Sequence, residues 1–202
     1  MTTEWSDSLE LLFKKTAEHF LCLRWSHDNA QRYCQTRNSY LSIPVIILSG
    51  LAGMGSVGSE NLLPFQNSNL LVGFISFVAG TLQTISSFYS FAKRAEAHRV
   101  SAISYERLHR MIEFELKIDR GHRQKPADLI DKVKEEADRL NEISPLLPSH
   151  SILAFKKAFP SAETTLAVPA LLNGLSPTEV LKTLPDAPLP AASGVKVKIV
   201  EV

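Results

Sequence analysis

Two long stretches without charge dominate the pattern of hydrophobic and polar positions along the chain. Residues 40–59 and 69–92 carry no charged side chain, and between Asn38 and Ala92 the single charge is Glu60. A helix of twenty residues is about 30 Å long, which matches the hydrocarbon core of a bilayer. The connecting residues 60–68 include Pro, Asn and Gln, which suit a turn. The pattern predicts an all-α hairpin that crosses a membrane twice. Its alternative is a pair of buried helices in a soluble bundle.

The segments on either side of the hairpin have the spacing of amphipathic helices. Residues 4–37 lack Pro and Gly, which predicts one long helix that enters the first span, with Pro44 tolerated or kinking it. The second span is expected to continue through residues 93–119 as a helix with a stripe close to a heptad repeat. Pro126 opens a further helix, which is expected to pack antiparallel to it with complementary charge. The stripe comprises Val100, Ile103/Ser104, Leu108, Met111/Ile112, Glu115 and Ile118.

Eight of the eleven prolines lie between Pro145 and Pro190, so the segment after residue 143 is interpreted as a Pro-rich tail and not as a second packed domain. Within it, residues 176–183 begin with a capping box and predict a short helix, and residues 195–202 alternate like a strand. The predicted organisation is an N-terminal cytosolic amphipathic helix (1–39), a two-span hairpin (40–92), a cytosolic helical region (93–143) and the tail (144–202).

Positive charges flank both outer ends of the hairpin and are absent from its loop. Cytoplasmic segments carry an excess of Lys and Arg close to the ends of membrane spans. We therefore expect a multi-pass membrane protein with both termini in the cytosol. The cations that set this topology are Arg32, Arg37, Lys93, Arg94 and Arg99, with Arg24, Arg107 and Arg110 farther away.

Composition narrows the function classes further. A net charge of +1 argues against a nucleic-acid binder that works by bulk charge, and 45% hydrophobic residues argue against disorder. Cys22 and Cys34 lie twelve residues apart in one predicted helix, about 18 Å, so they are not expected to bridge each other. No cofactor is expected.

Motifs of enzymes and metal sites match poorly. Residues 53–58 spell G-x-G-x-x-G, but neither a helix start nor an acidic residue follows at the spacing of a dinucleotide fold. Glu106 with His109 is half of a di-iron motif, and His19 with Cys22 could supply two zinc ligands, yet neither pair has partners at a suitable spacing. We expect a protein that is not an enzyme.

Small and hydroxyl residues recur every three or four positions in the second span. A polar stripe in a lipid-embedded helix must be hidden against the first span, against other copies of the chain, or against water in a pore. The glycines of the first span are expected to let helices approach closely. The stripe, a candidate pore or packing face, comprises Gly73, Ser76, Gly80, Gln83, Thr84 and Ser87, and the close-approach glycines are Gly50, Gly53, Gly55 and Gly58.

The layout resembles the SLATT family, the two-transmembrane effectors associated with SMODS nucleotidyltransferases and SLOG sensor domains. The resemblance covers about residues 10–145. It rests on the long helix with Trp25, Ala30 and Tyr33, the run Ser42-Ile43-Pro44-Val45-Ile46-Ile47-Leu48-Ser49-Gly50, the Ser/Thr face of the second span, and the basic helix that begins Ala95-Glu96-Ala97-His98. It implies a membrane effector of nucleotide-signalled defence that oligomerises and permeabilises the bilayer when a partner sensor is activated.

These observations predict an oligomeric membrane effector that forms or gates a pore. Its expected partners are the lipid bilayer, further copies of itself and a cytosolic sensor protein, with no nucleic acid. The alternative is a non-enzymatic membrane anchor or scaffold of an organelle or virion membrane, whose tail recruits partners.

Overall fold

The structure is a computed structural model that describes residues 4–58, 68–162 and 166–174. The described part is helical without any strand, so the predicted all-α fold is confirmed. The elements are α1 (Asp7–Gly58), α2 (Ser68–Tyr89), α3 (Phe91–Lys117), the 3-10 turn η1 (Arg120–His122), α4 (Pro126–Ile143), α5 (Ser149–Ala158) and α7 (Ala170–Asn173).

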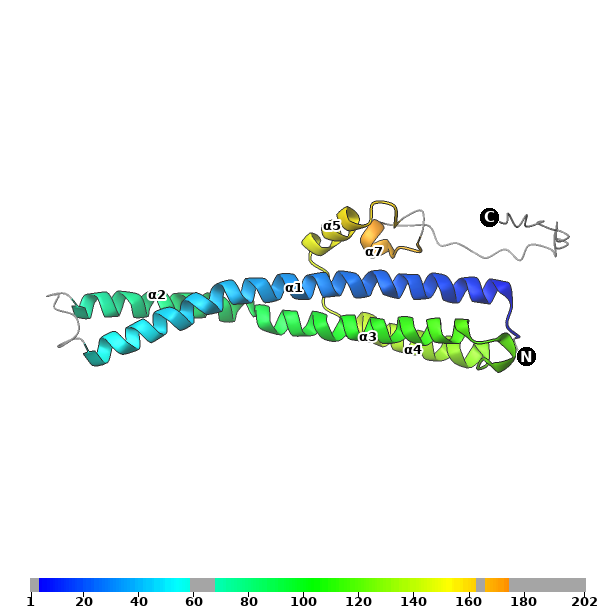
Figure 1. Cartoon of the computed structure of the whole chain (residues 1–202), viewed down its shortest axis with the longest axis horizontal. Helices are drawn as coiled ribbons and strands as arrows, with labels where there is room; N and C mark the ends of the chain where they lie inside the picture. The colour runs from blue at the N-terminus through cyan, green and yellow to red at the C-terminus, as the bar shows by residue number, and fades with distance from the viewer. Residues whose placement is uncertain (1–3, 59–67, 163–165, 175–202) are drawn as a thin grey trace, which may run out of the picture.

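Helix α1 organises the whole molecule. Its 52 residues form one uninterrupted helix, roughly 78 Å long at 1.5 Å per residue. One end of α1 pairs with α2 to form the hairpin, and the other end packs with α3 and α4 to form a three-helix bundle (Figure 1). Pro44 lies inside α1, and Figure 1 shows that α1 changes direction where it enters the hairpin. The expected long helix that runs into the first span is therefore present.

The bundle is built on a heptad pattern that α1 and α3 share. In α1, buried residues recur at Phe13, Phe20 and His27, and in α3 they recur at Tyr105 and Ile112. The repeat of seven keeps one seam of each helix facing the other, as in a coiled coil. Phe20 stacks on Tyr105 with ring centroids 6.0 Å apart. Full burial of a side chain such as Ile112 stabilises the fold by about 1.5–3 kcal/mol.

Helix α4 completes the bundle core and runs antiparallel to α3, as expected (Figure 1). The contact is apolar, because Leu129, Val133 and Leu140 of α4 pack into the shared core. The ion pairs between elements that the described residues show join α1 to α3 and to the turn after α3, and not α3 to α4. The described residues thus show an apolar contact between α3 and α4 and no ion pair for the complementary charge that the sequence predicted.

The second span does not continue smoothly into the bundle, because Ser90 interrupts the helix. The residues of α2 that face α1 recur at steps of three and four up to Ser86. If the helix continued without a break, Lys93 and Val100 would lie on this same face. Ser90 has a left-handed conformation (φ 49°, ψ 41°), which costs about 1–2 kcal/mol in a residue with a side chain. The break shifts the phase, so His98 is buried and Val100 is 46% exposed. The apolar stripe predicted for residues 93–119 is therefore wrong at its start, because His98 and not Val100 is the buried residue.

Two arginines close the far end of the bundle. Arg123 binds Glu10 at 2.6 Å and lies 4.9 Å from the centre of the Trp5 ring. Arg120 binds Glu10 at 2.7 Å and also contacts Asp7. These two guanidinium groups lower the pKa of Glu10 to about 2. The start of α1 is therefore held to the turn after α3 by charge.

Acid should break the ion pairs between Glu10 and the two arginines. The pKa of Glu10 is lowered from 4.5 to about 2, so its stabilising effect is present above pH 4.5 and is lost as the pH falls toward 2. With Trp25→Phe as background, Trp5 is the single tryptophan. Its emission is expected to shift to the red over this pH range, and Glu10→Gln should show the shifted spectrum already at pH 7. An identical acid transition in both proteins would contradict this assignment.

The described part of the segment after residue 143 is folded against α1. Helices α5 and α7 pack on the side of α1 (Figure 1), where Phe155 and Leu172 form a second apolar cluster with Cys22. The ring of Trp25 meets Phe155 edge to face, with centroids 5.6 Å apart. The expected unpacked tail is thus wrong for these helices, because Phe155 of α5 and Leu172 of α7 pack on a surface of α1 that the bundle leaves free. The predicted helix at 176–183 and strand at 195–202 lie outside the described residues.

Candidate functional site: the membrane hairpin

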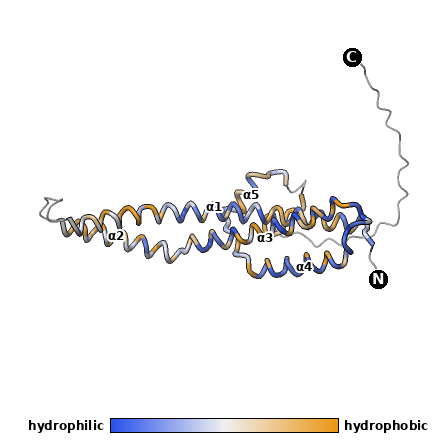
Figure 2. The backbone as a smooth tube through the Cα atoms, turned by 60° about the horizontal axis from the view of Figure 1, so that its bottom comes forward, coloured by the Kyte–Doolittle hydropathy of each residue, from blue (hydrophilic) through white to orange (hydrophobic). Residues whose placement is uncertain are grey.

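The hairpin exposes most of its apolar surface. Two helical segments, Asp7–Ser56 and Leu70–Lys117, are long and apolar enough to cross a membrane, and only 11% and 6% of their most apolar windows are buried. The core helix of a soluble protein would be mostly buried. Ile46, Phe77 and Phe88 are 70%, 72% and 82% exposed, and Figure 2 shows apolar residues along this part of the chain. The exposure favours a membrane over the alternative of two buried helices.

A narrow face holds the two hairpin helices together. Val45 and Ala52 of α1 and Ala79 of α2 are the buried residues there. Val72, Ile75, Leu82 and Ser86 of α2 are partly buried on the same side as Ala79, at steps of three and four. The spacing places them in one sector of the helix, at roughly 100° per residue. Small and branched residues thus supply the contact between the spans.

The polar stripe of the second span lies beside this contact face and not within it. All six of its predicted members are exposed within the chain. On the helix circumference they fill the sector between the contact face and the exposed phenylalanines, again at roughly 100° per residue. We call these residues the polar flank: Gly73, Ser76, Gly80, Gln83, Thr84 and Ser87.

A groove of about 450 Å³ runs between the polar flank and α1. Ser49 of α1 lies across it from Ser76, Gly80 and Gln83 of α2. The Thr84 hydroxyl donates a hydrogen bond to the Gly80 carbonyl (2.9 Å), which satisfies it within its own helix. The Gln83 amide makes no hydrogen bond to any residue that the structure describes. Of the three ways to hide the polar stripe, packing against the first span is therefore not the one used.

The four glycines of the first span differ in what surrounds them. At Gly55 an added Cβ would lie 2.8 Å from Cγ2 of Val72, so this glycine allows a close approach of α1 and α2. At Gly50 and Gly53 nothing lies within 4 Å of that position. Within the described part of the chain these two make no close approach. Gly58 is the last residue of α1 and its surroundings are not described.

The predicted topology cations gather where the hairpin meets the bundle. Arg32 pairs with Asp28 (3.0 Å) and Arg99 with Glu96 (2.7 Å), each within its own helix. Arg37 lies over the ring of Tyr33, 5.2 Å from its centre. Lys93 and Arg94 lie in the first turn of α3, three and four residues after Ser90, and are exposed. The structure thus brings all five together at one end of the hairpin, as an exposed cationic belt.

A buried histidine pair joins α1 and α3 just beyond this belt. His27 and His98 are 2% and 3% exposed, and their Nδ1 atoms lie 3.0 Å apart, so one ring donates and the other accepts. Burial, and then the neighbouring His98, lowers the pKa of His27 to about 4, and burial with Arg94 lowers that of His98. Both rings are neutral at pH 7. Sequence reasoning missed this pair, although His27 lies on the same heptad as Phe13 and Phe20.

Residues considered above as possible metal ligands have structural partners. Glu106 binds Arg24 at 2.6 Å, and His109 Nδ1 lies 3.1 Å from the Ala17 carbonyl oxygen. Burial raises the pKa of the Cys22 thiol to about 11, and the two cysteines are unbridged, as predicted. Among the described residues no three His, Cys, Asp or Glu side chains gather to hold a metal. The G-x-G-x-x-G match lies inside α1 and forms no phosphate loop.

Comparisons of the chain with models of known protein families, with curated proteins and with solved structures found no match. The fold and the hairpin therefore define the class of protein by themselves. It is an all-α protein with two helices able to cross a membrane, joined to a bundle of three helices.

Proposed function

We propose that the chain is an oligomeric two-span membrane effector that forms or gates a pore. The observation that carries this proposal is the open polar flank, above all the Gln83 amide without a partner in the described chain. An amide and several hydroxyl groups facing hydrocarbon cost free energy, so such a surface meets protein or water. Two helices do not enclose a water path, and several copies are therefore required.

The proposed arrangement places the polar flanks of neighbouring hairpins toward one another. Gly73 and Gly80 leave space for a second backbone, because no side chain and no other helix among the described residues lies within 4 Å of a Cβ added to either. Gln83 and Ser87 then bond to the neighbouring copy or line water. The phenylalanine side, with Phe77 and Phe88, faces lipid.

The cationic belt supports the proposed orientation, with the bundle and both termini in the cytosol. In this orientation the three-helix bundle is the part that a cytosolic sensor protein can reach. The resemblance to SLATT effectors suggests such a partner, whose signal would be transmitted along α1 and α3 into the hairpin. Phe114, 69% exposed on α3, offers part of a contact surface.

Dye and ion leakage from liposomes tests the proposal directly. Purified protein is reconstituted, its insertion is verified by flotation, and its mass in detergent is measured by light scattering. We expect a discrete oligomer and leakage that rises with the protein-to-lipid ratio. A monomer that inserts and leaves the liposomes tight would overturn the proposal and favour the alternative, a membrane anchor or scaffold.

A further inference from the structure

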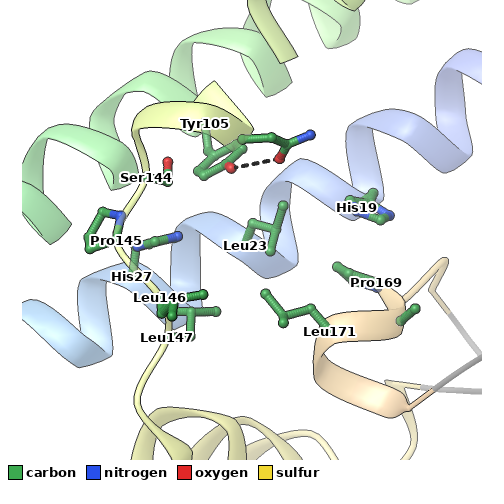
Figure 3. Close-up of a pocket in the computed structure, with 12 residues that line it drawn as sticks. His19, Leu23, His27, Tyr105, Ser144, Pro145, Leu146, Leu147, Pro169 and Leu171 are labelled. Carbon is green, nitrogen blue, oxygen red and sulfur yellow. Dashed lines mark hydrogen bonds between the residues drawn. The ribbon is translucent and has the colours of Figure 1, made fainter. Parts of the chain in front are cut away.

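We propose that the bundle carries a binding site for a small uncharged molecule, in a pocket between α1, the start of the segment after α4, and α7. The pocket has a volume of about 280 Å³. His19, Leu23 and His27 line it from one face of α1, at steps of four residues. Segments far apart in the sequence form the other walls, with Tyr105 from α3 and Pro169 beside α7 (Figure 3).

The polar groups of the pocket lie at its ends. The Tyr105 hydroxyl donates to Oδ1 of Asn141 at 3.4 Å, a long bond that leaves the amide nitrogen of Asn141 available. Ser144 also lines the pocket, but its hydroxyl is enclosed and makes no hydrogen bond within the described chain, so a ligand does not reach it. The amide nitrogen of the exposed Asn141 is therefore the group at this end to which a ligand oxygen can bind. His19 lies at the opposite end (Figure 3).

The middle of the pocket is apolar. Leu23 from α1 and Leu171 from α7 face each other across it in Figure 3, and Leu147 and Pro145 border it. No Lys, Arg, Asp or Glu is among the described residues that line the pocket. Burial lowers the pKa of His19, so this imidazole is neutral at pH 7. The pocket offers no counter-charge to a phosphate or a carboxylate, and this favours an uncharged ligand.

Size narrows the ligand class further. The volume equals roughly nine water molecules at about 30 Å³ each, and it lies just below the range of drug-sized pockets. The fitting ligand is a compact molecule with an apolar, ring-sized body and an uncharged amide, carbonyl or hydroxyl group whose oxygen accepts a hydrogen bond from the Asn141 amide. Since α7 forms one wall, an occupied pocket also fastens the C-terminal segment onto α1.

Two probes of matched shape test the site. Benzamide is uncharged, and benzoate has the same ring with a negative charge. The full chain, labelled with ¹³C in its leucine methyl groups, is titrated with each probe in detergent micelles. Benzamide should shift the signals of Leu23 and Leu171 to saturation in the millimolar range, and benzoate should bind at least tenfold more weakly. Leu70 and Leu71 on the exposed hairpin report partition of either probe into the detergent.

Two tryptophan variants complete the test. Leu171 is 55% exposed, so Leu171→Trp can fill the pocket without disturbing the core, and it should abolish saturable binding. Leu153→Trp makes the same change at a residue of α5 that is 67% exposed and outside the pocket, and it should keep binding. Absence of a saturable shift, equal binding of benzoate, or unchanged binding in Leu171→Trp would each overturn the proposal. Binding is measured without leakage, so its failure is separate from failure of the pore.

Discussion

Gly80→Leu is expected to reduce liposome leakage at least tenfold and to convert the oligomer in detergent to smaller species, while insertion into the bilayer stays intact. The reason is that Gly80 lies on the polar flank, where a Cβ added to it meets no side chain and no other helix of the described chain within 4 Å. A larger side chain at this position therefore begins in open space within one copy, and we expect its clash to arise where a second copy approaches. Leakage, flotation and mass in detergent measure the three effects.

Two further glycines make matched controls for this experiment. Gly50→Leu introduces the same side chain in the first span, where nothing lies within 4 Å and the position faces away from the polar flank, so leakage should not change. Gly55→Leu meets Val72 at 2.8 Å and should loosen the hairpin within each copy, which lowers its thermal stability. Equal leakage from Gly80→Leu and Gly50→Leu would show that the polar flank is not the surface between copies.

Acidification from pH 7.5 to 5 is expected to destabilise the bundle by about 2 kcal/mol through His27. Its pKa is lowered from 6.5 to about 4 in the folded chain, so between these values the unfolded chain binds more protons. The contribution of His27 to the free energy of unfolding is therefore fully present above pH 6.5 and falls as the pH drops toward 4. Each pKa unit corresponds to about 1.4 kcal/mol. In a protein of this size the loss lowers the melting temperature by roughly 4–8 °C.

Circular dichroism of the full chain in detergent, recorded at pH 7.5, 6 and 5, measures this effect. The double variant His27→Leu with His98→Leu replaces both rings by apolar side chains of similar volume. Its melting temperature should fall less on acidification, and at pH 5 it should exceed that of the parent chain. Some acid sensitivity remains because burial also lowers the pKa of His19. His122→Gln, on the exposed 3-10 turn, is the control and should melt like the parent chain. A double variant with unchanged acid sensitivity would assign the effect to other groups.

The local sequence pattern was sufficient to predict the long helices and the hairpin. The long helix through Pro44, the start of a helix at Pro126 and the two apolar spans follow from spacing, charge and the proline rules, which act over a few residues. The polar flank was found in the same way, because residues three and four apart share a face. Its exposure was not predictable, since it depends on which face of α1 the second span meets.

The parts that sequence reasoning missed depend on contacts between distant residues. The left-handed Ser90 decides that His98 and not Val100 faces α1, and thereby creates the pair with His27. No local signal marks Ser90 as different from the serines before it. The packing of α5 was missed for a related reason, because prolines indicate loops but say nothing of Phe155, whose partner Trp25 lies far away in the chain.

The sequence by itself determined that this is an all-α chain with two helices able to enter a membrane and a cationic end, because length, hydropathy and charge are properties of single segments. Only the tertiary structure decided that the contact between the spans leaves the polar flank open, that two histidines meet in the bundle, and that α7 closes a pocket against α1. Those features depend on the relative rotation of packed helices, which is set by the sum of many weak contacts and not by the pattern of any one helix.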